Sequence, residues 1–403
     1  MILYYVFVLS LPLVSHPIFG SDAGGMTVSK YLGLGCFLYA LVVLAGRRRP
    51  VGFLATPQAR CYLWLYALAL LSYAVSLLGP NPGHWSVVVL YTSQLVFFIT
   101  TLILVDSLER LRRVLLVAIG SVALGSLYML KEWWGGSAVY GAEYRPGYVT
   151  GDPNFFAASA ILCLPLAFGW ALEGRRGWER VYCLGCLLLG LAASMVAASR
   201  GGFLGLLIAL GVFVWHSRYR ARAMTVVPAA LALFLLVSPS SPVRRLFDPT
   251  HGDLEARNTR FELWSAGLKM VGSHPLLGVG LGNFKSQAGR YSGLGSDLKL
   301  LAHNGYLDVA AEVGLPALAA LLGILFYSYR TAARVRRQTR KEGPLALHHA
   351  ALGIEAGLVG FAVALIFVSG LFLKLFWLMA FLSMRLPDLQ RQARRPQEKA
   401  MAA

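Results

Sequence analysis

His303 is the side chain best suited to acid–base chemistry in this sequence. It stands in the stretch His303-Asn304-Gly305-Tyr306-Leu307, which closes the longest polar segment of the chain, residues 240–305. Arg257 and Arg260 precede it in the same segment. An imidazole changes charge near neutral pH, and guanidinium groups bind phosphate oxygens through paired hydrogen bonds. Together they predict proton transfer beside a bound anion, with Asn304 and Tyr306 as candidate substrate contacts.

The two arginines belong to a stretch, residues 257–271, that has the period of a helix. Its apolar residues recur at helical spacing on one face; they are Phe261, Trp264, Leu268 and Val271. One interpretation is that the arginines bind a phosphate or diphosphate, with Trp264 beside the substrate. The alternative is an interfacial helix whose arginines reach lipid headgroups.

Two further segments offer candidate binding residues. Ser199-Arg200-Gly201-Gly202 predicts a tight turn into a helix, and the positive helix N-terminus with Arg200 would form an anion site. A headgroup anchor is the alternative for Arg200. Asp152 can cap a helix that begins with Pro153, so Asp152 and Asn154 are candidates for substrate binding or for structure. Arg145, in the polar stretch 131–153, is a weaker substrate contact.

Other motifs carry less chemistry. The glycines at 278, 280 and 282 lack the strand–turn–helix context of a nucleotide loop and predict sharp turns. His274 precedes a proline in the same region and is interpreted as structural. Glu312 lies nine residues after His303, on the opposite side of an ideal helix and about 13 Å along it. We therefore expect Glu312 to pack into the bundle with a partner such as an arginine.

The polar segments offer no pair of acids that suits a metal ion. Asp152 and Asp248 stand alone in the sequence, so we expect a site without a metal and without a cofactor. Glu355 and Lys374 fall within or at the end of apolar runs, where a charge needs either a partner or a function.

The composition predicts the scaffold that holds these residues. The 403 residues are 57% hydrophobic and 14% charged, whereas soluble domains carry about 25% charged residues. We predict an all-α polytopic membrane protein of about twelve spans. The expected spans are 1–15, 31–46, 61–79, 85–105, 113–130, 154–173, 181–198, 201–216, 223–239, 306–329, 347–369 and 371–386.

The lysines and arginines predict the orientation. With both termini in the cytoplasm, 24 of the 37 basic residues fall in inside segments, as expected for loops at anionic headgroups. This pattern accounts for the net charge of +18 without a nucleic-acid partner. Nine spans then occupy residues 1–239, the segment 240–305 lies outside, three spans occupy 306–386, and 387–403 form a cytoplasmic tail.

The order of these motifs resembles the O-antigen ligase and polymerase superfamily of bacterial envelope glycosyltransferases. The resemblance covers residues 150–320. The first 140 residues resemble the family in their hydropathy only. It rests on Gly151-Asp152-Pro153-Asn154, Ser199-Arg200-Gly201-Gly202, Arg260-x-x-x-Trp264, the run His274 to Gly280, His303-Asn304-x-Tyr306-Leu307 and Glu312-x-Gly314.

This resemblance implies an inner-membrane enzyme that takes a glycan from undecaprenyl diphosphate at the periplasmic face. His303 would be the base for the acceptor hydroxyl, and Arg200 and Arg260 would hold the donor diphosphate. We expect direct displacement with inversion at the anomeric carbon.

Several functions remain open at this point. The favoured one is a ligase that passes the glycan to lipid A–core. A polymerase would pass it to another lipid-linked unit, and a protein O-oligosaccharyltransferase would pass it to Ser, Thr or Tyr. A secondary transporter or flippase is the more distant alternative, because the two halves show no internal repeat and polar residues concentrate on one face.

Overall fold

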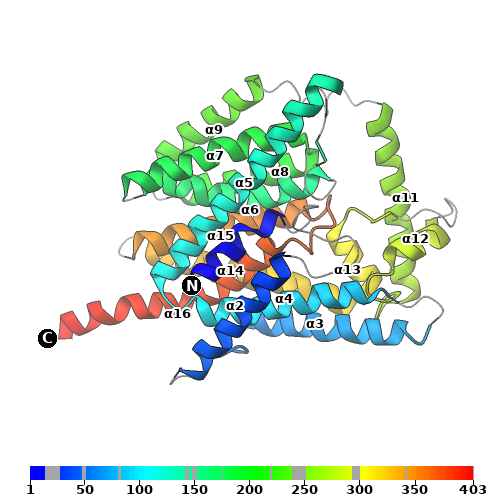
Figure 1. The fold of residues 1–403 in the computed structure, drawn as a ribbon, viewed down its shortest axis with the longest axis horizontal. Coiled ribbons are helices and arrows are strands. Elements are labelled where there is room, and N and C mark those ends of the chain that lie inside the picture. The colour runs from blue at the N-terminus through cyan, green and yellow to red at the C-terminus, as the bar shows by residue number, and fades with distance from the viewer. Residues whose placement is uncertain are drawn as a thin grey trace.

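The computed structural model is helical throughout the residues that it describes (Figure 1). The described residues are 1–13, 28–47, 51–79, 83–140, 144, 146–147, 152–174, 176–217, 220–237, 251–292, 300–340 and 343–402. The α-helices are α1 (Ile2–Leu9), α2 (Val28–Ala45), α3 (Pro57–Ser76), α4 (Trp85–Leu104), α5 (Leu108–Tyr140), α6 (Pro153–Glu173), α7 (Gly177–Ala197), α8 (Arg200–His216), α9 (Arg220–Val237), α11 (His251–Ser273), α12 (Phe284–Ser292), α13 (Gly305–Val313), α14 (Leu315–Thr339), α15 (Leu345–Ala364) and α16 (Lys374–Ala402).

Eight helices in the described part of the chain are long and apolar enough to cross a membrane: α2 to α7, α14 and α15. The prediction of a polytopic helical membrane protein is therefore confirmed. The other four expected spans correspond to α1, with 8 residues, to α8, with 17, and to α9 and α16. The count of about twelve spans stays a prediction.

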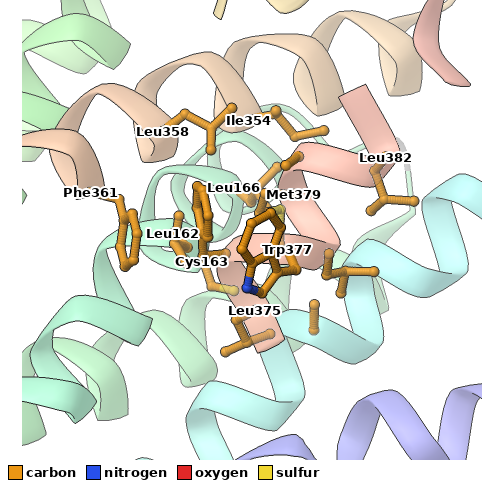
Figure 2. Close-up of a cluster of buried hydrophobic side chains, with 14 of the residues drawn as sticks. Leu162, Cys163, Leu166, Ile354, Leu358, Phe361, Leu375, Trp377, Met379 and Leu382 are labelled. Carbon is orange, nitrogen blue, oxygen red and sulfur yellow. The ribbon is translucent and has the colours of Figure 1, made fainter. Parts of the chain in front are cut away.

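The core of the bundle lies where α6, α15 and α16 meet. Figure 2 shows Leu162 of α6, Phe361 of α15 and Trp377 of α16 in one buried cluster. Small residues let the helices approach, as in other membrane bundles: a Cβ on Gly357 would lie 2.9 Å from the carbonyl oxygen of Leu162. This close packing fixes the start of α6 and the end of α15, which both contribute to the candidate site.

Charged side chains pair at the end of the bundle away from α11 and α12. Arg47, after α2, lies 2.8 Å from Asp106, which separates α4 from α5. Arg336 of α14 pairs with Glu355 of α15, and both are buried. The buried Glu355 therefore has a structural partner, as a charge within an apolar bundle requires. Figure 1 shows α11 and α12 at one end of the molecule and the C-terminus at the other.

The expected span 306–329 is wrong as a single helix. It begins as predicted, at Gly305, but α13 ends at Val313 and α14 starts at Leu315. Gly314 separates them with φ +97°, and a Cβ there would lie 2.2 Å from the carbonyl oxygen of Leu276. Only glycine allows both the left-handed backbone and this close approach. α13 is consequently a short helix apart from the eight candidate spans.

Candidate functional site

The backbone around His303 is held by three hydrogen bonds. Asn304 caps α13, because its Oδ1 accepts hydrogen bonds from the backbone N–H groups of Tyr306 and Leu307. The N–H of Gly305 donates to the carbonyl of Leu365 at the end of α15. His303 itself adopts φ +50°, a left-handed conformation that a non-glycine residue keeps only when its surroundings enforce it.

The next turn of α13 is tied to the same neighbour. The hydroxyl of Tyr306 donates to the carbonyl of Ala362 at 2.6 Å. Asn304 and Tyr306 thus both use polar atoms to hold the loop that carries His303. Their contact with a substrate stays a prediction.

Trp264 fixes the peptide immediately before His303. Its Nε1–H donates to the carbonyl of Ala302 at 2.8 Å. The face of α11 predicted from periodicity is not its buried face: Phe261 is 58% exposed, whereas Leu263 and Met270 are fully buried. The exposed Phe261 agrees with a helix at an interface. The Trp264 hydrogen bond connects that helix to the loop that carries His303.

Asp152 faces His303 from the start of α6. Its Oδ1 accepts the backbone N–H of Asn154 at 2.8 Å and caps the helix. Its Oδ2 lies 3.8 Å from Nδ1 of His303. This distance is too long for a hydrogen bond, but it places a carboxylate beside the imidazole. The predicted cap is confirmed, and the same side chain lies beside His303.

Two cations act on the same imidazole. Burial lowers the pKa of His303 below its usual 6.5, the charges of Arg260 and Lys285 lower it further, and Asp152 opposes them. Arg260 lies one turn before Trp264 on α11, so the two side chains share a helix face. An imidazole in this field is held in the neutral form that accepts a proton.

Lys285 of α12 is the residue that sequence reasoning missed. It is exposed, and its charge acts on His303 and on the acidic side chains Asp308 and Glu312. Its one sequence signal is a lone basic residue directly after the glycine-rich turn. Lone basic residues are common on helix surfaces, so nothing in the sequence distinguished Lys285 from them.

The expectation of an arginine partner for Glu312 is wrong. Its carboxylate instead accepts the backbone N–H groups of Gly282 and Phe284, at 3.0 and 3.1 Å, at the start of α12. Burial raises the pKa of Glu312 to about 7 despite these two bonds. Its negative charge stabilises the N-terminus of α12 and so helps to hold Lys285 near His303.

Asp308 lies in the first turn of α13, after His303 and before Glu312 in the sequence. Burial raises the pKa of Asp308 to about 8, and the nearby charge of Glu312 raises it as well. A carboxyl with this pKa binds a proton at neutral pH and serves the fold in its neutral form. It therefore does not compete with Asp152 as the anion beside His303.

The segment between α11 and α12 closes the C-terminal end of α13. Backbone N–H groups of Val279 and Gly280 donate to the carbonyls of Ala311 and Glu312. Gly278 has φ +66°, and a Cβ there would lie 2.3 Å from the backbone of Glu312. The prediction that these glycines form sharp turns against the bundle is confirmed.

Arg200 begins α8 beside the same elements. Ser199 caps the helix by accepting the backbone N–H of Gly202 at 3.1 Å. A Cβ on Gly201 would lie 2.6 Å from Cβ of Phe367, just after α15, and one on Gly202 would lie 2.5 Å from Ala157 of α6. The start of α8 therefore packs near the helix ends that hold Asp152 and the His303 loop, and a joint role for Arg200 stays a prediction.

Two candidates cannot be located as side chains. Arg145 lies outside the described residues, and Arg257 is described only as part of the backbone of α11. Asn154 is half-buried and gives its backbone N–H to Asp152. Within the described ranges, no three His, Cys, Asp or Glu side chains gather to hold a metal ion. The absence of a metal stays a prediction.

Comparison with known proteins finds one family that part of this chain resembles. Residues 184–322 match the family model described as O-antigen ligase. This part of the chain is therefore similar to O-antigen ligases. The matched region includes Arg200, Arg260, Lys285 and His303, whereas Asp152 lies outside it. A search of curated proteins found no match.

Proposed function

We propose that this protein belongs to the O-antigen ligase superfamily and is a ligase-like glycosyltransferase. It would move a glycan from undecaprenyl diphosphate to a hydroxyl of lipid A–core, at the periplasmic face of the bacterial inner membrane. The observation that carries the proposal is His303, an imidazole set between the carboxylate of Asp152 and the cations Arg260 and Lys285. A base for an unactivated hydroxyl and cations for a departing diphosphate are the two requirements of this reaction.

In the proposed reaction, the acceptor oxygen attacks the anomeric carbon of the donor sugar. The new C–O bond forms as the bond to the diphosphate breaks, with inversion, and the bonding electron pair leaves with the diphosphate. Nε2 of His303 accepts the hydroxyl proton, while Arg260 and Arg200 neutralise the leaving group. No metal ion or cofactor is required. Arg145, Asn154 and Arg257 are retained as proposed substrate contacts.

The lowered pKa of His303 supports the role of base. The substrate diphosphate would raise this pKa when bound, and Arg260 and Lys285 offset that effect. The imidazole therefore stays neutral before the acceptor arrives and binds a proton as negative charge passes to the leaving group. The same cations serve both the base and the diphosphate.

A transfer assay with purified protein and lipid-linked donor tests the proposal. His303→Ala should lower the transfer rate by about 10²–10⁴-fold, the usual contribution of a general base. His84→Ala, which changes an exposed histidine at the start of α4, should leave the rate unchanged. Near-normal transfer by His303→Ala would reject the base, and activity lost in EDTA and restored only by a divalent ion would reject the metal-free mechanism.

The acceptor is tested in a deletion strain. Loss of all glycan from lipid A–core indicates a ligase, and caps of one repeat unit indicate a polymerase. Intact glycolipids with unmodified glycoproteins would indicate a protein O-oligosaccharyltransferase. Transport by proteoliposomes without glycan transfer would favour the transporter class instead.

A further inference from the structure

A polar cavity lies beside α12. It has a volume of about 210 Å³ and lies between the end of α3, the segment from His274 to Gly280, and α12. We call it the α3–α12 pocket. Ser72, Ser76, Gln287, Arg290 and Tyr291 contribute to its lining. Drug-sized ligands occupy roughly 300–1,000 Å³, so this pocket fits one small polar group such as a single sugar ring.

Gln287 is the feature that marks the pocket as a binding site. The residue is 7% exposed and lines the cavity. Within the described part of the chain its side-chain amide has no hydrogen-bond partner, although its backbone N–H bonds to Asn283. The small exposed part of Gln287 lines the cavity, where its amide can form hydrogen bonds with a ligand or with water. Its two donors and one acceptor match the hydroxyl groups of a sugar.

The charge of the pocket limits the kind of sugar. Arg290 is exposed, His274 also lines the pocket, and the described lining residues include no acidic side chain. A guanidinium group binds a carboxylate through paired, charge-assisted hydrogen bonds. Tyr291 adds a ring with an apolar face and a polar edge. The two serines already bond to backbone carbonyls, so Gln287 and Arg290 are the main available polar groups.

We propose that the α3–α12 pocket binds one hexuronate unit of the substrate glycan, with Gln287 on its hydroxyls and Arg290 on its carboxylate. As a subsite for that glycan it rests on the proposed function. The helix α13 separates the pocket from His303. The segment that lines the pocket bonds to the C-terminal end of α13, and His303 lies just before the N-terminus of α13. Nine helical residues span about 13 Å, so the bound unit is remote from the new bond.

Binding of simple sugars to the purified full chain in lipid nanodiscs tests this proposal without glycan transfer. Glucuronate and glucose are the probes, followed by saturation-transfer NMR. Glucuronate should bind saturably and more tightly than glucose. Arg290→Gln should weaken glucuronate binding by about ten-fold, the loss of one charge-assisted hydrogen bond, and should not change glucose binding. Gln287→Leu should weaken both sugars.

Matched controls separate this site from the catalytic one. Arg330→Gln removes an exposed arginine on α14 and should leave binding unchanged. His303→Ala should also bind glucuronate normally, so a failure of the proposed base leaves the pocket test intact. Arg290 is exposed, so its variant should fold even if Gln287→Leu does not. No saturable glucuronate binding, or binding unchanged by Arg290→Gln, would overturn the proposal, as would equal displacement by inorganic phosphate.

Discussion

Asp152 and His303 face each other across the junction of α6 and α13, with Oδ2 of the acid 3.8 Å from Nδ1 of the imidazole. The other oxygen of Asp152 caps α6. A carboxylate beside Nδ1 favours the tautomer with the proton on Nδ1, which leaves Nε2 as the acceptor. A small movement would close the gap to a hydrogen bond, as catalytic contacts often tighten when substrate binds.

Asp152→Asn separates this electrostatic role from helix capping, because Asn caps helices about as well as Asp. Asp152 raises the pKa of His303, so its loss should lower that pKa further. We expect slower transfer and an acid limb of kcat/KM that moves to lower pH. The rate loss should be smaller than the about 10²–10⁴-fold expected for removing the base.

The check is a pH–rate profile beside a folding control. Thermal melting of Asp152→Asn should match the parent protein, since the cap is kept. A profile with an unmoved acid limb would show that Asp152 acts on α6 alone.

Arg260→Gln should move the acid limb of the kcat/KM profile to higher pH, opposite to the shift expected for Asp152→Asn. Arg260 lowers the pKa of His303, so the imidazole of the variant binds a proton more tightly and loses activity at a higher pH. KM for the lipid-linked donor should also rise if Arg260 holds the diphosphate. Lys269→Gln, an exposed change on the same helix, is the control. A fall in kcat alone, with no shift of the limb, would contradict the proposed field around His303.

Trp264→Phe tests the hydrogen bond that holds the His303 loop. The change keeps an aromatic ring but removes the donor to Ala302, at a cost of about 1 kcal/mol, or roughly five-fold. We expect kcat to fall by about that factor with little change in KM, because the base is displaced and the binding groups are not. Glu262→Gln, an exposed change on the same helix, should have no effect. A rise in KM alone would make Trp264 a substrate contact instead.

The sequence predicted the elements of the site better than their connections. His303, Arg260 and Trp264 were found because residue type and helical spacing are local properties. The partner of Glu312 was missed because backbone N–H groups carry no residue identity, and any segment can supply them. Lys285 was missed because its role depends on the position of α12 against α13, which is set by tertiary packing.

The same reasoning explains the break in the expected span 306–329. The sequence stays apolar on both sides of Gly314, so hydropathy predicts a single helix there. The break depends on Leu276, whose carbonyl occupies the space of a Cβ at Gly314. Contacts between segments so far apart in the sequence are not encoded in a hydropathy window.

Asp308→Asn should change how stability depends on pH. Burial and Glu312 raise the pKa of Asp308 from 3.8 to about 8 in the folded protein. The folded state therefore binds this proton more tightly than the unfolded state, and stability is lost as pH rises from about 4 through about 8. The melting temperature of the parent protein should fall across this pH range, and that of Asp308→Asn should fall less. Glu262→Gln changes an exposed acid on α11 and should leave the change of melting temperature with pH as it is in the parent. If Asp308→Asn shows the same change with pH as the parent, the carboxyl of Asp308 is not its cause.

The buried pair of Arg336 and Glu355 should matter for stability and not for chemistry. Breaking a buried ion pair by removing one partner typically costs about 3–5 kcal/mol, because the other charge is left without compensation. Glu355→Met should therefore lower the melting temperature strongly, although His216, 3.6 Å from Glu355, is also present. The double change Arg336→Met with Glu355→Met should recover much of the loss, since neither charge then remains buried. Arg337→Met, an exposed neighbour on α14, is the control. The pair lies at the end of the bundle away from α11. The folded fraction of each variant should therefore keep its kcat. A loss of kcat without a loss of stability would instead connect this pair to the site at the opposite end.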